Sequence, residues 1–144
     1  MLQSKEFLRN IRTEASEIRQ LQLKRDWLYS TLLPKGITYK AVDVQESGPT
    51  DPMSEKFGEI YELEKLIENR MQSLIKKHLE AEKYISKLED SRYRIVLEMY
   101  YLSMQRTTWE DIAKEISYSY REVQRFHGNA LVELEKVIQS LQLT

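Results

Sequence analysis

The chain has 144 residues, of which 41% are hydrophobic and 31% charged, and its formal net charge is −1. That length suits one compact domain, or a small domain with an extended helical arm, and allows a modest core without a large enzyme pocket. A charge so close to zero argues against an indiscriminate nucleic-acid coat, which would be strongly basic. The absence of Cys excludes disulfide bonds and thiolate metal sites.

Four Gly and three Pro are few for this length, so long helices are expected. The segment MLQSKEFLRN lacks the apolar run of a signal peptide. No apolar stretch approaches the roughly 20 residues that span a bilayer. We therefore expect a cytoplasmic, all-α protein that has no membrane partner.

The first predicted helix runs from about Leu2 to Leu33. Its apolar residues recur at spacings of three, four and seven, with charged residues between them: Leu8, Ile11, Ala15, Ile18, Leu21, Leu28 and Leu32. Pro34 and Gly36 end this helix, and a polar loop is expected at about residues 34–52.

A second long helix is predicted from Pro52 to about Leu88, with Asp51 as its N-cap. Its seam alternates between steps of three and four, as in a coiled coil: Ile60, Leu63, Ile67, Met71, Leu74, His78, Ala81, Ile85 and Leu88. The same pattern fits an antiparallel hairpin within one chain and a coiled coil between copies of the chain. Residues 1–89 are thus predicted to form a long helical hairpin or coiled-coil arm.

Residues 90–144 are predicted to form a helix-turn-helix domain. It begins with a helix from Arg92 to about Leu102, and a short connector at Ser103–Thr107 follows this helix. From Asp90 onward seven Lys and Arg residues stand against eight Asp and Glu residues. Contact with DNA must therefore depend on a local cluster of cations and not on the net charge of the domain.

The segment TTWEDIAKEISYSYREVQRFHGNAL contains two helix starts. Thr108 with Asp111, and Ser119 with Glu122, have the spacing of capping boxes. Only the short turn at Ser117-Tyr118 separates the two helices, so they must cross steeply with their apolar faces in contact. This arrangement is typical of a helix-turn-helix.

Small and aromatic residues support the same interpretation, because Ala113 permits close approach of the helices and Tyr118 can pack into their core. On the opposite face, the second helix exposes polar residues in its first turns: Tyr120, Arg121, Gln124 and Arg125. Arg suits guanine, Gln suits adenine, and Tyr suits phosphate oxygens. Recognition helices insert these turns into the major groove. DNA binding is therefore the hypothesis that we set against a structural hairpin with a solvated polar face.

The segments LEDSRYRIVLEMYY and TTWEDIAKEISYSYREVQRFHGNALVEL resemble region four of sigma-70-type factors. The matching positions are Arg92, Arg94, Val96, Leu97, Ala113, Val123, Ala130 and Leu131. With its helical arm, the whole chain resembles the ArpU- and RinA-like late-transcription regulators of phages and prophages. The resemblance implies a helical arm followed by a sigma-region-four-like helix-turn-helix domain.

The resemblance also implies roles for single residues. Bases would face Tyr120, Arg121, Gln124 and Arg125, and phosphates would contact Thr107, Thr108 and Ser119. This chain departs from the family at two places. Tyr100-Tyr101 stands where members often carry an Arg-Tyr pair, so one cationic phosphate contact is missing. Ser117 stands where Gly is common in the turn, at a small cost if it is left-handed.

Catalysis has no support in the sequence. The two His residues, His78 and His127, have no metal-ligand neighbour at helical spacing. His78 is predicted to be partly buried in the seam, and His127 to lie at the surface. There is no phosphate-binding Gly loop and no recognisable nucleophile–base pair. We expect no enzymatic activity, no cofactor and no metal.

The sequence thus predicts a sequence-specific, DNA-binding transcription regulator of phage or prophage type. Its expected partners are double-stranded DNA, RNA polymerase, and further copies of the chain bound through the arm. Two alternatives stay open. A small terminase-like DNA-packaging subunit also joins a helix-turn-helix to an oligomerising arm. A pure interaction module would bind RNA polymerase or a sigma factor without touching DNA, and the near-neutral charge and Tyr100 favour this second alternative.

Overall fold

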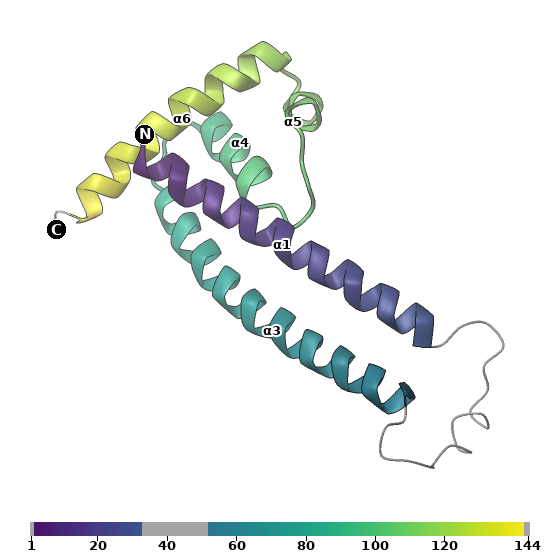
Figure 1. The fold of residues 1–144 in the computed structure, drawn as a ribbon. Helices are drawn as coiled ribbons and strands as arrows, with labels where there is room; N and C mark the ends of the chain where they lie inside the picture. Colours follow the sequence, from purple (N-terminus) through teal and green to yellow (C-terminus); the bar gives the residue numbers. More distant parts are fainter. Residues whose placement is uncertain (1, 33–51, 143–144) are drawn as a thin grey trace. The chain divides into compact units, whose positions relative to one another are not determined.

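The computed structural model describes residues 2–32 and 52–142, which form five helices and, within those ranges, no strand. The helices are α1 (Gln3–Leu32), α3 (Pro52–Ile85), α4 (Ser91–Tyr101), α5 (Trp109–Ile116) and α6 (Tyr120–Gln142) (Figure 1). The predicted all-α fold is confirmed. The predicted polar loop, up to residue 51, and the predicted Asp51 cap lie outside the described residues.

Two compact units make up the chain. Unit 1 comprises residues 1–16 and 73–144, and unit 2 comprises residues 17–72. Helices α1 and α3 each contribute one part to unit 1 and another to unit 2. This division does not coincide with the boundary expected at residues 89 and 90, because the first turns of α1 pack against α6.

In unit 1, Ser4 fixes the start of α1 against α6 and is fully buried. Its backbone N–H donates to Oε1 of Glu135 at 2.8 Å, and its hydroxyl donates to the carbonyl oxygen of Leu131 at 3.0 Å. On another side of α1, the ring of Phe7 meets Tyr84 of α3 edge-on, with centroids 6.2 Å apart. The first turns of α1 therefore contact both α3 and α6.

Helices α4, α5 and α6 share one core in unit 1. The residues buried at its centre are Val96, Ile112, Val123 and Phe126. Half-buried residues that pack around them include Tyr93, Met99, Trp109, Ala113, Ile116 and Tyr118. The core residues of α5 and α6 come from the apolar faces that the periodicity predicts, because burial of one stripe is what stabilises an amphipathic helix.

Helix α3 ends at Ile85, three residues before its predicted end near Leu88. The N–H of Leu88 donates to the carbonyl oxygen of Ile85 at 3.0 Å, so a tight turn replaces the last helical turn. Leu88 stays buried in this turn. The seam pattern therefore continues beyond the helix. Asp90 then caps α4, since its carboxylate accepts the N–H of Arg92 at 2.9 Å.

In unit 2, the second part of α1 packs antiparallel against the first part of α3. Their buried cluster consists of Leu28, Leu32 and Ile60. The hydroxyl of Tyr29 donates to Oε1 of Glu64 at 2.8 Å, and Arg70 lies 3.9 Å from the carboxylate of Glu17. Of the two arrangements that the seam allows, this unit has the hairpin within one chain.

The two long helices bury most residues of their predicted seams. Those buried are Leu8, Ile11, Ala15, Ile18, Leu28 and Leu32 of α1, and Ile60, Ile67, Leu74, Ala81 and Ile85 of α3. Half-buried members are Leu21, Leu63, Met71 and His78. The partial burial predicted for His78 is thus confirmed.

Candidate nucleic-acid interface

Helix α5 begins at the predicted capping box. The hydroxyl oxygen of Thr108 accepts the N–H of Asp111 at 3.1 Å, and Oδ2 of Asp111 accepts the N–H of Thr108 at 3.0 Å. Hydrogen bonds from the backbone N–H of Thr108, and then from its side chain, hold the pKa of the Asp111 carboxyl below its ordinary value. The side chain of Thr108 is therefore engaged with Asp111 in the cap and is not left free for a phosphate oxygen.

The other two residues assigned to phosphates use their hydroxyl hydrogens within the chain. The hydroxyl of Thr107 donates to the carbonyl oxygen of Gln105 at 3.3 Å. The hydroxyl of Ser119 donates to Oε1 of Glu122 at 3.2 Å and accepts the N–H of the same residue at 3.1 Å. The cap at the start of α6 therefore forms. The carboxylate of Glu122 accepts from the hydroxyl of Ser119, whereas in a capping box it would accept from the backbone N–H of Ser119.

The turn between α5 and α6 places Ser117 in the left-handed region, with φ 61° and ψ 43°. In the described part of the chain, it is the one non-glycine residue with positive φ. The N–H of Tyr118 closes the turn by donating to the carbonyl oxygen of Ala113 at 3.1 Å. The ring of Tyr118 meets Phe126 edge-on with centroids 4.9 Å apart. The expectation that Tyr118 packs into the core is confirmed.

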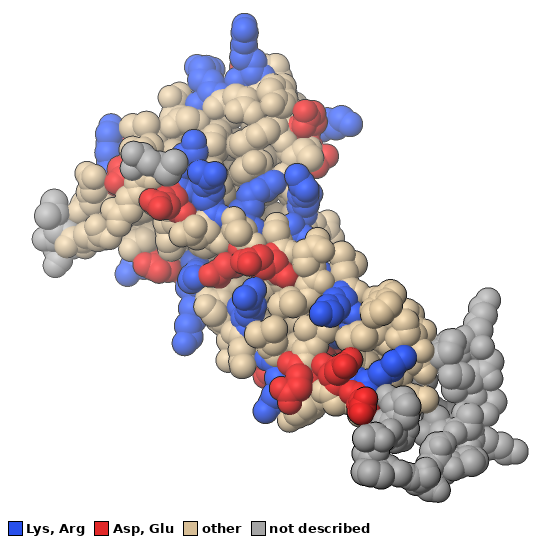
Figure 2. Space-filling view, viewed as in Figure 1, with Lys and Arg blue, Asp and Glu red and all other residues tan. Residues whose placement is uncertain are grey.

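The start of α6 presents the predicted base-facing residues. Tyr120, which is 47% exposed, projects into solvent together with Arg121 and Arg125, whereas Gln124 is half-buried. Among the described residues, neither Arg121 nor Arg125 forms a hydrogen bond or ion pair. Figure 2 shows Lys and Arg side chains over the part of the surface that α6, α5 and the start of α1 form, with acidic side chains beside α5.

Arg12 of α1, which the sequence reasoning missed, contacts the end of α4 and the segment before α5. Its guanidinium lies 3.8 Å from the ring centroid of Tyr100, and the same ring stacks on Trp109 with centroids 3.8 Å apart and 9° between the planes. Arg12 also donates to the backbone carbonyl oxygens of Tyr100 and Thr107. Because 88 positions separate Arg12 from Tyr100, helical periodicity carries no signal for this contact.

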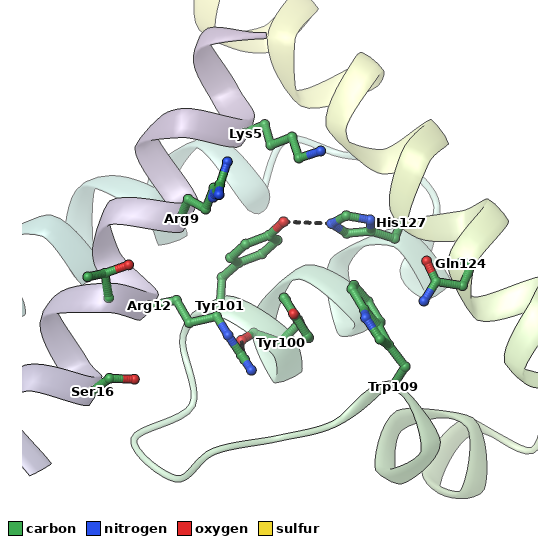
Figure 3. A pocket seen from close by; sticks show the side chains of 10 residues that line it. Lys5, Arg9, Arg12, Ser16, Tyr100, Tyr101, Trp109, Gln124 and His127 are labelled. Carbon is green, nitrogen blue, oxygen red and sulfur yellow. Dashed lines mark hydrogen bonds between the residues drawn. The ribbon is translucent and has the colours of Figure 1, made fainter. Parts of the chain in front are cut away.

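A pocket of about 590 Å³ opens beside this stack in unit 1, and we call it the basic pocket. The residues that matter for its chemistry are Lys5, Arg9 and Arg12 of α1, Tyr101 of α4, and Gln124 and His127 of α6 (Figure 3). None of the lining residues is Asp or Glu. Gln124 belongs both to the predicted base-facing set and to this lining, so the pocket borders the exposed face of α6.

His127 is not the surface residue that the sequence predicts. It is half-buried, and its Nε2 lies 2.6 Å from the hydroxyl oxygen of Tyr101. Burial, with a further contribution from the charge of Lys5, lowers the pKa of His127 to about 4. Burial raises the pKa of Tyr101 to about 12. Both side chains are therefore uncharged at neutral pH.

Two other kinds of site, a metal centre and a membrane span, are absent from the described part of the chain. Within residues 2–32 and 52–142, no group of three or more His, Asp or Glu residues is placed to hold a metal ion. Over the same ranges, none of the helices has the length and apolar character needed to cross a membrane. The Nε2 atom of His78 is buried without a hydrogen-bond partner in this part of the chain, and burial lowers the pKa of that residue.

Comparison with known proteins identifies the family. Residues 39–135 match the family described as a protein of unknown function (DUF1492). This match covers more than half of the chain, so the chain belongs to the DUF1492 family; helix α1 lies outside the matched residues. No curated protein and no solved structure matches the chain. The comparisons identify neither a sigma-70 region four nor an ArpU-like family.

Proposed function

We propose that this member of the DUF1492 family is a sequence-specific, DNA-binding transcription regulator whose helix α6 enters the major groove. The observation that carries the proposal is the exposed start of α6. There, Arg121 and Arg125 are exposed and form no hydrogen bond or ion pair within the described chain, while Val123 and Phe126 anchor the opposite face of the same turns in the core. A buried face of this kind holds the reading side chains in one orientation.

The cations of the neighbouring helix α4 are engaged in structure. Arg92 forms a bidentate pair with Asp90, at 3.1 Å and 2.8 Å, and Arg94 donates to the carbonyl oxygens of Leu88 and Glu89. They are therefore poor candidates for phosphate contacts. The proposed interface is small, and weak binding by a single copy follows from it, since each phosphate contact adds to the affinity.

The proposal of a phage or prophage regulator is supported by the resemblance to sigma-region-four-like late-transcription regulators. In that case RNA polymerase is the expected protein partner, and the helical arm is the expected site of homo-oligomer formation. The role of α6 in reading DNA does not depend on either partner, so it can be tested with the purified chain alone.

The test is selection of binders from a random pool of duplex DNA, with sequencing of the retained fraction and a salt series on the enriched motif. We expect a defined motif and an affinity that falls as salt rises. Arg121→Ala with Arg125→Ala should abolish the enrichment. The matched control, Lys76→Ala with Lys83→Ala, removes two exposed cations from α3 and should leave it intact. No enriched motif at low salt would contradict the proposal.

A second candidate function is that of an interaction module for RNA polymerase or a sigma factor. The observation that favours it is the exposure of large apolar side chains in unit 2, where Trp27 is 62% exposed, Leu23 61% and Phe57 47%. Exposed apolar groups of this size often mark protein contacts. Under this function the pair Arg121→Ala and Arg125→Ala keeps the binding to polymerase, whereas Trp27→Ala reduces it.

A further inference from the structure

The basic pocket concentrates positive charge that no described residue neutralises. Lys5, Arg9 and Arg12 follow one another at spacings of four and three, so they share one face of α1. All three line the pocket, and no carboxylate lines it. Elsewhere in unit 1, Lys77 is paired with Glu14, and Arg92 with Asp90. Like charges gathered in this way repel one another and favour an anion between them.

The three cations differ in how many contacts they make within the described chain. Arg12 is held by the ring of Tyr100 and by two backbone carbonyl oxygens, so its position is fixed. Lys5 and Arg9 form no hydrogen bond and no ion pair with any residue that the structure describes. Their donors are therefore available to a ligand, while Arg12 supplies a fixed charge at the wall of the pocket (Figure 3).

Neutral groups complete the lining in a way that suits a phosphate. The amide of Gln124 can donate a hydrogen bond. His127 is uncharged at neutral pH because burial and the nearby Lys5 lower its pKa to about 4. When Nε2 of His127 accepts the hydroxyl hydrogen of Tyr101, the ring proton resides on Nδ1. Two free cations beside neutral donors are the chemistry that recognises a phosphate group.

We propose that the basic pocket binds a phosphate group, and that its source is the DNA backbone next to the groove that α6 enters. The choice of source rests on the function proposed above. It is argued from Gln124, which belongs both to the base-facing set of α6 and to the pocket lining. A DNA strand that contacts the start of α6 brings phosphates toward Lys5 and Arg9. Helix α1, which lies outside the residues matched by the family, is thus part of the DNA interface.

The experiment compares three proteins by fluorescence anisotropy on a labelled duplex. They are the unmodified chain, the pair Lys5→Gln and Arg9→Gln, and the control pair Lys76→Gln and Lys83→Gln. Each is titrated at several salt concentrations on the selected motif and on an unrelated duplex. For the pocket pair we expect weaker binding by a similar factor on both duplexes. The slope of log affinity against log salt should become shallower by about 2, one for each lost phosphate contact. The control should retain the original slope.

Failure of this inference is distinguishable from failure of the proposed function. If the unmodified chain binds the selected motif and the pocket pair keeps its salt slope, the phosphate role is overturned and the function of α6 stands. If the unmodified chain binds no duplex, the proposed function fails. The pocket is then tested with adenosine monophosphate, using the fluorescence of Trp109 in a Trp27→Phe background. Binding that is lost in the pocket pair assigns the phosphate to a free nucleotide, and the absence of binding overturns the inference.

Discussion

The hydroxyl oxygen of Tyr101 lies 2.6 Å from Nε2 of His127, and this contact joins the end of α4 to α6. The bond requires an unprotonated Nε2 when the hydroxyl donates. Burial lowers the pKa of His127 to about 4, so the required form predominates at neutral pH. Protonation of His127 would place a cation beside Lys5 and remove the acceptor of the Tyr101 hydroxyl.

We expect His127 to make the stability of unit 1 sensitive to acid. Its pKa in the folded chain, about 4, lies below the ordinary 6.5, so the unfolded chain takes up the proton first. The stabilisation is complete above about pH 6.5 and is lost as the pH falls toward 4, by at most about 1.4 kcal/mol per pH unit. Urea unfolding at pH 7 and pH 5 should show a smaller loss for His127→Gln than for the unmodified chain.

Burial also lowers the pKa of His78. The same measurement on His78→Gln therefore gives the part of the acid-dependent loss of stability that is due to His78. Equal losses of stability between pH 7 and pH 5 for the unmodified chain and His127→Gln would show that the Tyr101–His127 contact does not couple folding to pH.

Arg12→Lys should destabilise unit 1 although it keeps the charge. A lysine lacks the planar group that lies over Tyr100 and the two donors that reach the carbonyl oxygens of Tyr100 and Thr107. We expect a loss of about 1–2 kcal/mol in urea unfolding, which is less than a charged hydrogen bond and a cation–π contact contribute together, because lysine keeps its charge and can still donate a hydrogen bond. In a Trp27→Phe background, the fluorescence of Trp109 should also change. Arg9→Lys is the control and should stay within about 0.5 kcal/mol; equal effects of the two changes would refute the role of Arg12.

Ser117→Gly should stabilise the turn between α5 and α6. The left-handed conformation costs a non-glycine residue roughly 1–2 kcal/mol, and glycine removes this cost. The greater freedom of glycine in the unfolded chain offsets about 0.5–1 kcal/mol of the gain in stability. A net gain of up to about 1 kcal/mol is expected from thermal or urea unfolding. Ser117→Ala, which keeps a Cβ in the same conformation, should show no comparable gain. A Gly variant less stable than the Ala variant would contradict the strain at this turn.

Thr108→Ala should lower stability by about 1 kcal/mol, because it removes the side chain that caps α5. Thr108→Ser keeps the capping oxygen and should recover most of the loss. Thr107→Ala is the neighbouring control, since the one bond of the Thr107 hydroxyl within the described chain is to the carbonyl oxygen of Gln105. Circular dichroism during urea unfolding measures all three. If Thr107→Ala were as damaging as Thr108→Ala, the cap would not be the source of the effect.

Features that depend on neighbours along the chain could be predicted from the sequence. The cap at Thr108, the short turn and the apolar faces of α5 and α6 each involve residues within about four positions of one another, so local spacing specifies them. The two long helices could also be predicted from the sequence, because the apolar residues of their seams recur at regular spacings. The sequence leaves open whether Ser117 is left-handed, because its backbone angles depend on how the two helices cross.

Contacts between distant segments could not be predicted. His127 sits at the edge of the apolar stripe of α6, where spacing alone suits either solvent or a neighbour, and Tyr101 of α4 decides the outcome. The basic pocket was missed for the same reason. Lys5 and Arg9 look like ordinary solvated charges on α1, and only the packing of that helix against α6 brings them to Gln124 and His127.

The buried Ser4 has a consequence for how the protein is made. Its two bonding partners on α6 lie 127 and 131 positions later in the chain. A ribosome therefore releases the first turns of α1 long before their partners exist, and unit 1 cannot close until α6 has emerged. Closing so long a loop late makes folding slower than the local helices alone would allow. A polypeptide interrupted before α6 would leave Ser4 without both of its hydrogen-bond partners, and the start of α1 would lack this attachment.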